Sequence, residues 1–211
     1  MNLFPDLQPA GADLEKLAVA LEAIETPPGA LYDLAHARPE ILPDAPMVWE
    51  PCTGTGVLAD ALEQLGYRVF ASDIHDWGYS KAYDVIQDVL EFTEAPCPFV
   101  VTNPPFSKAA QIVRHLLAIG ARRTIIYQGW TWYLQQGEKA ELFRELPPAY
   151  VLALERRCGQ WHFTTPLDQR KGHSTQRFAW YVWEAGHQGD MRVNRLPKVD
   201  AAPPVAGRRE G

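Results

Sequence analysis

Apolar residues along this chain fall into two alternating patterns, one typical of strands and one typical of helices. Short apolar runs predict buried strands over residues 47–50, 68–72, 84–90, 99–102, 124–127, 150–154 and 178–183. Apolar residues spaced three and four apart predict helices over residues 13–24, 31–37, 57–65, 108–119 and 138–146. This alternation of strand and helix predicts an α/β fold.

A glycine-rich turn separates the first predicted strand from the helix that follows it. The sequence Glu50-Pro51-Cys52-Thr53-Gly54-Thr55-Gly56 lies there, and the next strand ends at Asp73, 19 residues after Gly54. This order of strand, Gly-x-Gly turn, helix, strand and acid is the opening of a Rossmann-like nucleoside-binding unit. Glycines let a ligand approach the backbone, and the acid is placed to bind a ribose diol. Ala59 occupies the position where a pyrophosphate cofactor favours a third glycine, and Glu50 adds a negative charge, so a cationic ligand without phosphate is expected.

The fourth predicted strand runs into the sequence Asn103-Pro104-Pro105-Phe106. The Asn103 side-chain oxygen and the Pro104 carbonyl both accept hydrogen bonds, and neither proline offers an N–H. Phe106 offers a flat face on which a base can stack. Two acceptors beside an aromatic ring suit a planar substrate with an exocyclic NH2 group. Asp88, after the third strand, is a candidate partner for an adenine amino group.

Between the last two predicted strands lies an insertion over residues 155–177. It carries five basic and two acidic residues with aromatic residues among them, which is typical of a surface for single-stranded nucleic acid or a flipped base. The irregular spacing of Cys158, His162 and His173 does not favour a zinc site, and no metal is expected. The candidate nucleic-acid contacts are Lys108, Arg156, Arg157, Trp161, Arg170 and Lys171.

Composition narrows the class of protein. The net charge of −6 excludes a wholly basic nucleic-acid binder, so any such contact must come from a local patch. Three cysteines far apart in the sequence indicate reduced thiols. The first residues lack the basic region and apolar core of a signal peptide, and no apolar run is long enough to span a membrane. A cytoplasmic protein without membrane contact is therefore expected.

With both motifs in place, the chain resembles the S-adenosylmethionine-dependent amino-methyltransferases. More narrowly, it is similar to the small adenine-N6 DNA methyltransferases of phages and prophages. The resemblance covers about residues 25–185, and its most specific elements are the turn over residues 50–56 and Asn103-Pro104-Pro105-Phe106. Thr26-Pro27 matches a Thr-Pro that such enzymes often carry before the first strand, and residues 178–184 are similar to their closing strand.

The resemblance implies a Rossmann-like, doubly wound sheet of seven mostly parallel strands, whose last two form an antiparallel hairpin. A helical segment over residues 1–24 would precede the methyltransferase domain, and a flexible tail over residues 186–211 would follow it. The catalytic residues implied are Asn103, Pro104, Pro105 and Phe106. The residues implied to bind S-adenosylmethionine are Thr26, Pro27, Glu50, Pro51, Cys52, Gly54, Gly56, Asp73, Ile74, Asp88, Val89 and Asn103.

The implied function is methylation of adenine N6 in DNA, with the base extruded into the Asn-Pro-Pro-Phe pocket. Similar motifs serve RNA adenine N6, cytosine N4 and protein glutamine N5 methylation, so these substrates stay open as alternatives. A cofactor-binding subunit without turnover is a further alternative. No separate target-recognition domain is evident, and the sequence makes no prediction of the target sequence or the oligomeric state.

Overall fold

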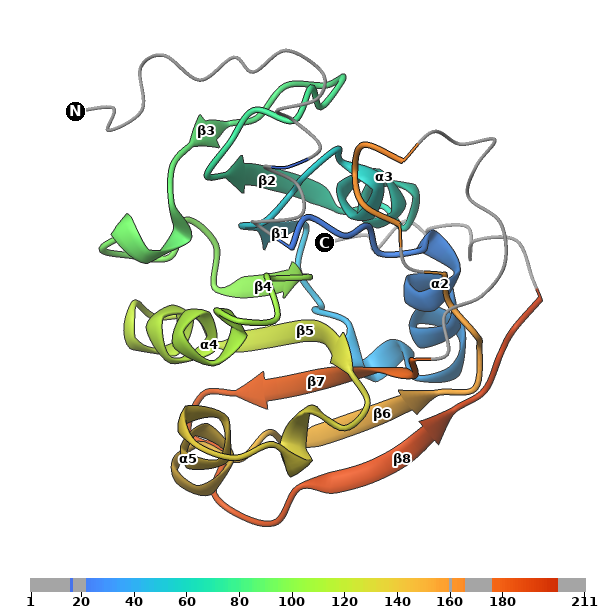
Figure 1. The fold of residues 1–211 in the computed structure, drawn as a ribbon, viewed down its shortest axis with the longest axis vertical. Helices are drawn as coiled ribbons and strands as arrows, with labels where there is room; N and C mark the ends of the chain where they lie inside the picture. Colours follow the sequence, from blue (N-terminus) through green and yellow to red (C-terminus); the bar gives the residue numbers. More distant parts are fainter. Residues whose placement is uncertain (1–15, 17–21, 160, 166–175, 201–211) are drawn as a thin grey trace.

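The computed structural model describes residue 16 and residues 22–159, 161–165 and 176–200. One mixed sheet forms the centre of the molecule, with strand order β3-β2-β1-β4-β5-β7-β6-β8 (Figure 1). The strands are β1 (Met47–Glu50), β2 (Arg68–Asp73), β3 (Val85–Ile86), β4 (Phe99–Thr102), β5 (Arg123–Gly129), β6 (Tyr150–Leu154), β7 (Phe178–Glu184) and β8 (Arg192–Leu196).

Strand order reverses between β1 and β4, and this reversal decides where a ligand can bind. The strands β3, β2, β1, β4 and β5 are parallel, and β1 pairs with β2 on one side and with β4 on the other. In open α/β sheets, the crevice beyond the carboxyl ends of the strands at such a reversal is the usual ligand site. β7 runs antiparallel to both of its neighbours, β5 and β6.

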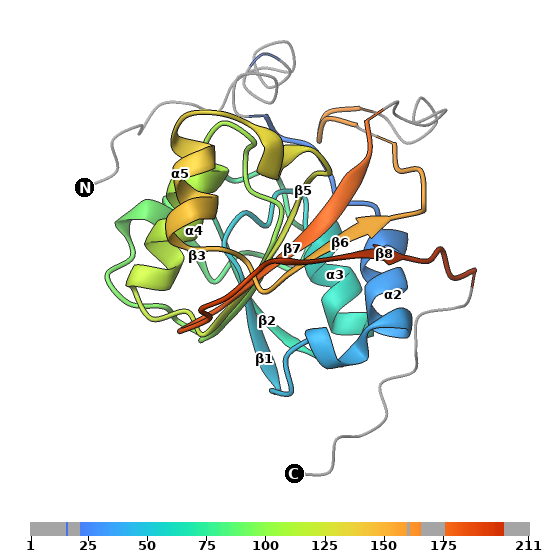
Figure 2. The ribbon, with the colours of Figure 1, turned by 90° about the horizontal axis from the view of Figure 1, so that it is seen from below.

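Helices cover both faces of the sheet. Figure 2 shows α2 and α3 on one face and α4 and α5 on the other. The helices are α2 (Pro28–Ala37), α3 (Val57–Gln64), α4 (Ala109–Ala118) and α5 (Glu138–Glu145), with short 3-10 helices η1 (Pro39–Ile41), η2 (Val89–Glu91) and η3 (Trp132–Leu134). Within the described residues, no helix is long and apolar enough to cross a membrane.

Each helix buries its apolar stripe against the sheet. On the α2 and α3 face, Leu34 and Leu62 are fully buried in one core cluster with Trp180 of β7. On the other face, Tyr181 and Trp183 of the same strand pack with α4 and α5 residues. The strand β7 therefore faces apolar residues on both sides, which explains its uninterrupted apolar sequence.

The tail predicted to be mobile contributes an eighth strand. β8 pairs in parallel with β6 over its whole length, so the expected number of seven strands is corrected to eight. Leu196 is fully buried in the α2-side core, and Arg156 donates to the Val199 carbonyl at 2.9 Å. The four exposed residues before Leu196 made this edge strand look like a polar tail.

Two further predicted elements differ from the structure. The strand predicted over residues 84–90 is reduced to two residues, because Asp88 ends it by capping η2. The helix predicted over residues 13–24 does not include its last residues, because Ile24 forms an antiparallel bridge with His162. Most of that predicted helix and residues 201–211 of the predicted tail lie outside the described residues.

Candidate functional site

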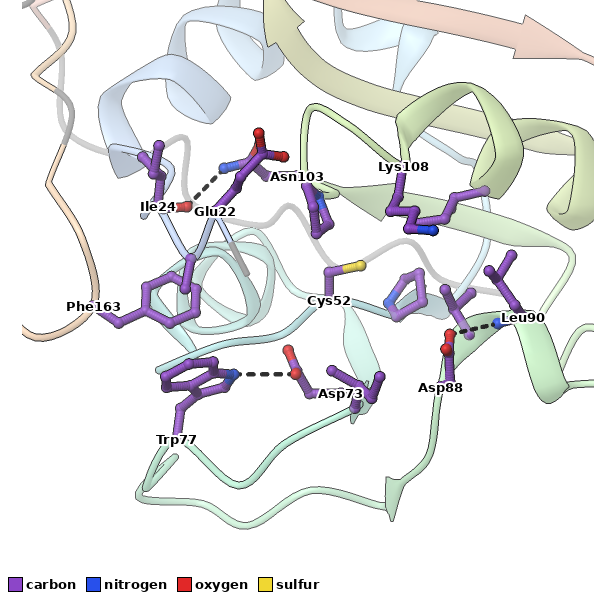
Figure 3. Close-up of a pocket in the computed structure, with 16 residues that line it drawn as sticks. Glu22, Ile24, Cys52, Asp73, Trp77, Asp88, Leu90, Asn103, Lys108 and Phe163 are labelled. Atoms are coloured by element: carbon purple, nitrogen blue, oxygen red, sulfur yellow. Dashed lines mark hydrogen bonds between the residues drawn. The ribbon is translucent and has the colours of Figure 1, made fainter. Parts of the chain in front are cut away.

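A cavity of about 190 Å³ lies beyond the carboxyl ends of β1, β2 and β4, where the strand order reverses (Figure 3). It is the place where the sequence motifs meet. Its walls comprise Glu22, Ala23, Ile24, Pro51, Cys52, Asp73, Ile74, Trp77, Asp88, Val89, Leu90, Asn103, Pro105, Lys108, Ile112 and Phe163. The two motifs, nearly fifty residues apart in the sequence, therefore share one cavity.

The glycine-rich turn borders the cavity through Pro51 and Cys52, while its two glycines do not line the cavity and adopt left-handed backbone conformations. Gly54 has a φ of 56° and Gly56 has a φ of 88°, a region that other residues rarely adopt. A Cβ on Gly54 would lie 2.2 Å from Cζ of Phe163, and one on Gly56 would lie 2.0 Å from Cδ2 of Tyr79. The rings of Phe163 and Tyr79 therefore lie directly against the backbone of the turn, where any larger residue than glycine would collide with them.

Asp73, at the end of β2, is bound to the turn and to the loop after it. Its Oδ2 accepts the Gly54 N–H at 2.8 Å, and its Oδ1 accepts the His75 N–H at 3.1 Å. The same Oδ1 accepts the Trp77 Nε1–H at 3.2 Å (Figure 3). Burial raises the pKa of Asp73 to about 6, although these hydrogen bonds favour the ionised form. The carboxylate is thus held at the cavity wall in a fixed orientation.

Glu50, at the end of β1, lies beneath the turn and is not part of the cavity wall. Its side chain is fully buried, and its Oε1 accepts hydrogen bonds from Thr102 and from the Cys52 N–H. Burial raises its pKa well above the ordinary value, and the nearby Asp73 adds to this, so the neutral form is favoured. The predicted negative charge facing a ligand is corrected to a buried group that supports the turn. Its Oε2 has no hydrogen-bond partner.

Asn103 follows β4 and points its amide between the cavity and the chain segment before α2. Its Nδ2 donates to the Ile24 carbonyl at 2.9 Å, which fixes the orientation of the amide. Its Oδ1 is buried and has no hydrogen-bond partner. A buried acceptor that is oriented but unused is costly in a folded protein and is a common feature of binding sites.

The rest of the Asn-Pro-Pro-Phe sequence takes three different positions. The Pro104 carbonyl accepts a hydrogen bond of 3.0 Å from Nε2 of Gln128, a buried residue of β5 that the sequence did not single out. Pro105 lines the cavity. Phe106 lies away from the cavity, with its ring centroid 6.4 Å from that of Phe178.

Asp88, Val89 and Ile74 form the side of the cavity beyond Asp73. The Asp88 side chain accepts the Leu90 N–H at 2.9 Å and so caps η2 (Figure 3). Ile74 is 50% exposed although it is apolar, because it extends along the cavity wall. A flat, mostly apolar ligand with one polar edge would suit this side.

The segment over residues 22–26 covers the cavity. Sequence reasoning gave a cofactor role to Thr26 in this segment and missed its other residues. Glu22 accepts the Ser107 N–H at 2.7 Å, and Thr55 donates to Glu25 at 2.9 Å. The segment also pairs with residues 161–163 of the insertion, since the Glu25 N–H donates to the Trp161 carbonyl and the Phe163 N–H to the Ala23 carbonyl. These contacts join distant parts of the chain, and no local pattern in the sequence signals them.

Two predicted cofactor residues lie beside the main cavity. Thr26 lines a small adjoining cavity of about 10 Å³, which shares Ile24, Cys52, Asn103 and Phe163 with the main one. The Thr26 hydroxyl is buried without a hydrogen-bond partner. Pro27 does not line either cavity and instead begins α2 as its N-cap.

The candidate nucleic-acid contacts take different positions in the structure, and not all of them are available to a ligand. Lys108 lines the cavity, Arg157 is exposed, and Trp161 packs across the backbone of Gly159. Arg156 has a structural position instead, because its guanidinium donates two hydrogen bonds, of 2.7 and 2.8 Å, to the buried Asp33. Arg170 and Lys171 lie outside the described residues.

No family model and no curated protein matches the chain. Solved structures match its fold. The methyltransferase subunit of a type I restriction-modification system from Streptococcus thermophilus superposes with a TM-score of 0.55 and 12% sequence identity, over 82% of this chain and 47% of that chain. The modification subunit of a putative type I restriction enzyme from Vibrio vulnificus YJ016 superposes with a TM-score of 0.52 and 11% sequence identity. The match covers 92% of this chain and 54% of that chain.

A putative RNA methyltransferase from Pyrococcus horikoshii gives a TM-score of 0.51 and 18% identity, over 81% of this chain and 98% of that chain. The chain spans about half the length of the two restriction-system subunits. These likenesses confirm the predicted Rossmann-like fold of class I methyltransferases.

Proposed function

We propose that the protein transfers a methyl group from S-adenosylmethionine to a planar exocyclic amine of a nucleic-acid base, namely N6 of adenine in DNA. The observation that carries the proposal is the Asn103 amide. Its oxygen is buried, oriented through Ile24 and without a partner, beside a cavity whose other walls suit a nucleoside.

The cavity residues fit this cofactor. Asp73 is placed to accept hydrogen bonds from ribose hydroxyls, and Asp88 with Val89 and Ile74 would hold the adenine. The left-handed turn at Gly54 and Gly56 would lie against the methionine part once Phe163 had moved from Gly54. When bound, the cofactor would supply an electrophilic methyl group on its sulfonium.

The Thr26 hydroxyl is a further unpaired polar group at this end. A buried hydroxyl without a hydrogen-bond partner beside the turn supports the binding of a polar ligand there.

Asn103 would bind the target amine and increase its nucleophilicity. The lone pair of an aromatic NH2 group is delocalised into the ring, so the amine attacks poorly. A hydrogen bond accepted by Asn103 Oδ1 and another accepted by the free lone pair of the Pro104 carbonyl would favour a tetrahedral nitrogen. As the N–C bond formed, the bond from the methyl group to the sulfonium sulfur would break and leave a neutral thioether. The nitrogen would then be acidic enough to lose its proton to water, so no base is needed beforehand. Orientation and these two acceptors would provide the catalysis.

A nucleic-acid base is favoured over a glutamine side chain by two cationic residues and one aromatic residue. Lys108 lies at the cavity and Arg157 is exposed on the insertion, so both can contact phosphates. Phe106 offers a ring on which an extruded base can stack. RNA adenine, cytosine N4 and glutamine N5 are the alternatives that the experiment below separates.

The test is a methylation assay on unmodified DNA, followed by digestion to nucleosides and mass spectrometry. We expect N6-methyladenine with the wild-type protein and none with Asn103→Ala, while both bind S-adenosylhomocysteine equally in calorimetry. The control is Asn194→Ala, which removes an exposed amide on the edge strand β8 and should keep full activity.

Each other outcome contradicts part of the proposal. Methylation of RNA, of cytosine or of a glutamine peptide would identify the substrate as one of the alternatives. Cofactor binding without transfer to any of these polymers would indicate a non-catalytic subunit. Full activity of Asn103→Ala would overturn the role given to Asn103.

A further inference from the structure

A second cavity, of about 250 Å³, lies at the same edge of the sheet on the far side of β4 from the first. Nothing in the proposed function uses it. It lies where β6 ends, β7 begins and β8 ends, and its walls comprise Trp130, Ala153, Leu154, Glu155, Arg177, Phe178 and Arg195.

One aromatic contact, between Phe178 and Phe106, connects this cavity to the Asn-Pro-Pro-Phe sequence. Phe178, one of its wall residues, stacks on Tyr127 with ring centroids 4.9 Å apart and packs beside Phe106 at 6.4 Å. The first cavity is bounded by Asn103 and Pro105 of the same sequence. The proposed target base at Phe106 would therefore lie between the two cavities, with the cofactor on one side.

The second cavity has a net positive charge in a chain whose total charge is −6. Its charged groups are two guanidiniums, of Arg177 and Arg195, and one carboxylate, of Glu155. Arg195 Nη2 lies 2.9 Å from Glu155 Oε1, but its side chain is 82% exposed. Arg177 makes a long hydrogen bond, 3.4 Å, to the Glu155 carbonyl. Both cations can therefore also contact an incoming anion.

Trp130 adds an aromatic wall to this charged pocket. Its ring is half-buried, with Tyr133 against it edge to face at 5.5 Å. Its backbone N–H donates to the Arg177 carbonyl at 2.8 Å, so the ring and the cation are held as neighbours. Cations beside an aromatic face are the combination with which proteins hold a phosphate backbone and a stacked base.

We propose that the second cavity binds the strand next to the target nucleotide, with Arg177 and Arg195 contacting backbone phosphates and Trp130 contacting the face of a neighbouring base. The inference rests on the proposed function, since it assumes a nucleic-acid substrate with its target base at Phe106. Glu155 opposes phosphate binding and limits the affinity, because it competes for Arg195.

The experiment measures affinity for an adenine-containing oligodeoxynucleotide, single-stranded and duplex, over a salt titration. Arg177→Gln and Arg195→Gln should each weaken binding about tenfold at low salt and reduce the log–log salt slope by about one. Glu155→Gln should tighten binding. Trp130→Leu should weaken binding without changing the salt slope, because stacking releases no counterions.

The matched control is Arg192→Gln. Arg192 lies at the other end of β8, over the Tyr150 ring. Its replacement by glutamine changes the total charge by the same amount as the two test substitutions. It should leave the salt slope within a few tenths of the wild-type value. All variants should bind S-adenosylhomocysteine as wild type does. The arginine and glutamate variants should also keep its melting temperature, whereas Trp130→Leu should lower it slightly through the lost contact with Tyr133.

Failure of this inference is distinguishable from failure of the proposed function. If the wild type methylates DNA but Arg177→Gln and Arg195→Gln behave like Arg192→Gln, the second cavity is not a strand site and the proposed function stands. If the wild type neither binds nor methylates DNA or RNA, the proposed function fails and this inference with it. Methylation of a glutamine peptide alone would overturn both in favour of a protein substrate.

Discussion

The Asn103 side chain donates a hydrogen bond of 2.9 Å to the backbone carbonyl of Ile24, 79 positions earlier in the chain. This bond determines which end of the Asn103 amide is the NH2 group and which is the oxygen. The NH2 group faces the covering segment, and the buried Oδ1 has no partner, so under the proposed function it would accept from the substrate amine. The segment over residues 22–26 therefore belongs to the site, as a support for its central acceptor.

Asn103→Asp tests this orientation, since it replaces the donor to Ile24 by an oxygen that can accept only. Two acceptors would then face each other, and the side chain would have to turn away. We expect methyl transfer to fall by about 10- to 100-fold, from the loss of roughly 1–3 kcal/mol. Initial rates at saturating cofactor measure it. Glu22→Gln, which keeps an acceptor for the Ser107 N–H, is the control, and an equal loss there would count against the orienting role of Ile24.

Gln128→Leu tests the support of the Pro104 carbonyl. The substitution removes the N–H that this buried carbonyl accepts at 3.0 Å. A carbonyl without its donor loses its fixed position, at a cost of about 1 kcal/mol or more, so kcat should fall roughly tenfold. Affinity for S-adenosylhomocysteine should not change. The exposed Gln111 of α4 offers the control Gln111→Leu, and unchanged kcat in both variants would exclude a positioning role for Gln128.

Cofactor affinity should depend on the ionisation of Asp73. Its pKa is raised to about 6, so the carboxylate, which under the proposed function would accept the ribose hydroxyls, is lost as the pH falls through about 6. We expect the dissociation constant of S-adenosylhomocysteine to be constant above about pH 7 and to rise by up to about tenfold per unit below 6. The ligand's own groups do not titrate there.

Glu50, Cys52 and Tyr83 also lie near Asp73, so Asp73→Asn is needed to assign this pH dependence. The variant should bind S-adenosylhomocysteine more weakly, and its dissociation constant should show no inflection near pH 6.

The raised pKa of Asp73 also affects stability, because the folded state holds this proton more tightly than the unfolded chain does. Asp73 therefore adds stability below about pH 4 that is lost as the pH rises through about 6, and Asp73→Asn should remove that loss in urea titrations.

Gly54→Ala should reduce both stability and cofactor binding. The left-handed backbone costs about 1–3 kcal/mol for alanine, and the new Cβ would lie 2.2 Å from Phe163. Gly120→Ala separates the two effects, because Gly120 has a φ of 101° but open space around it. Urea denaturation and calorimetry should show stability loss in both variants and loss of S-adenosylhomocysteine binding only in Gly54→Ala. Normal cofactor binding by Gly54→Ala would mean that the ligand does not approach the turn.

Arg156→Met should destabilise the fold and leave nucleic-acid binding intact. It would leave the fully buried carboxylate of Asp33 without its bidentate partner, and breaking a buried pair costs about 3 kcal/mol or more. Arg157→Met, at the exposed neighbouring position, should change the free energy of unfolding by less than about 0.5 kcal/mol. If Arg156→Met instead weakened DNA binding without destabilising the protein, the sequence-based role of Arg156 would be correct.

Local sequence patterns were sufficient to predict the fold class and most of the first cavity. Apolar runs and stripes determine strands and helices through short-range geometry, so β1, α3, β4 and α4 lie within a residue or two of their predicted positions. The turn at Gly54 and Gly56, Asp73 and Asn103 were found because each follows a strand, and parallel strands bring their carboxyl ends to one edge. The shared role of the two motifs was implied by the family resemblance, and the geometry of parallel strands explains why they meet at one cavity in the structure.

Only the tertiary structure decided which polar side chains already have a hydrogen-bond or ion-pair partner within the protein. Arg156 looked like a phosphate ligand until it was found paired with Asp33, and Glu50 looked like an exposed charge until it was found buried under the turn. β8 was hidden because four of its five residues are exposed, so this edge strand carries no apolar alternation. Burial, pairing and long-range contacts such as that of Asn103 with Ile24 depend on how distant segments pack, and residue order alone does not specify them.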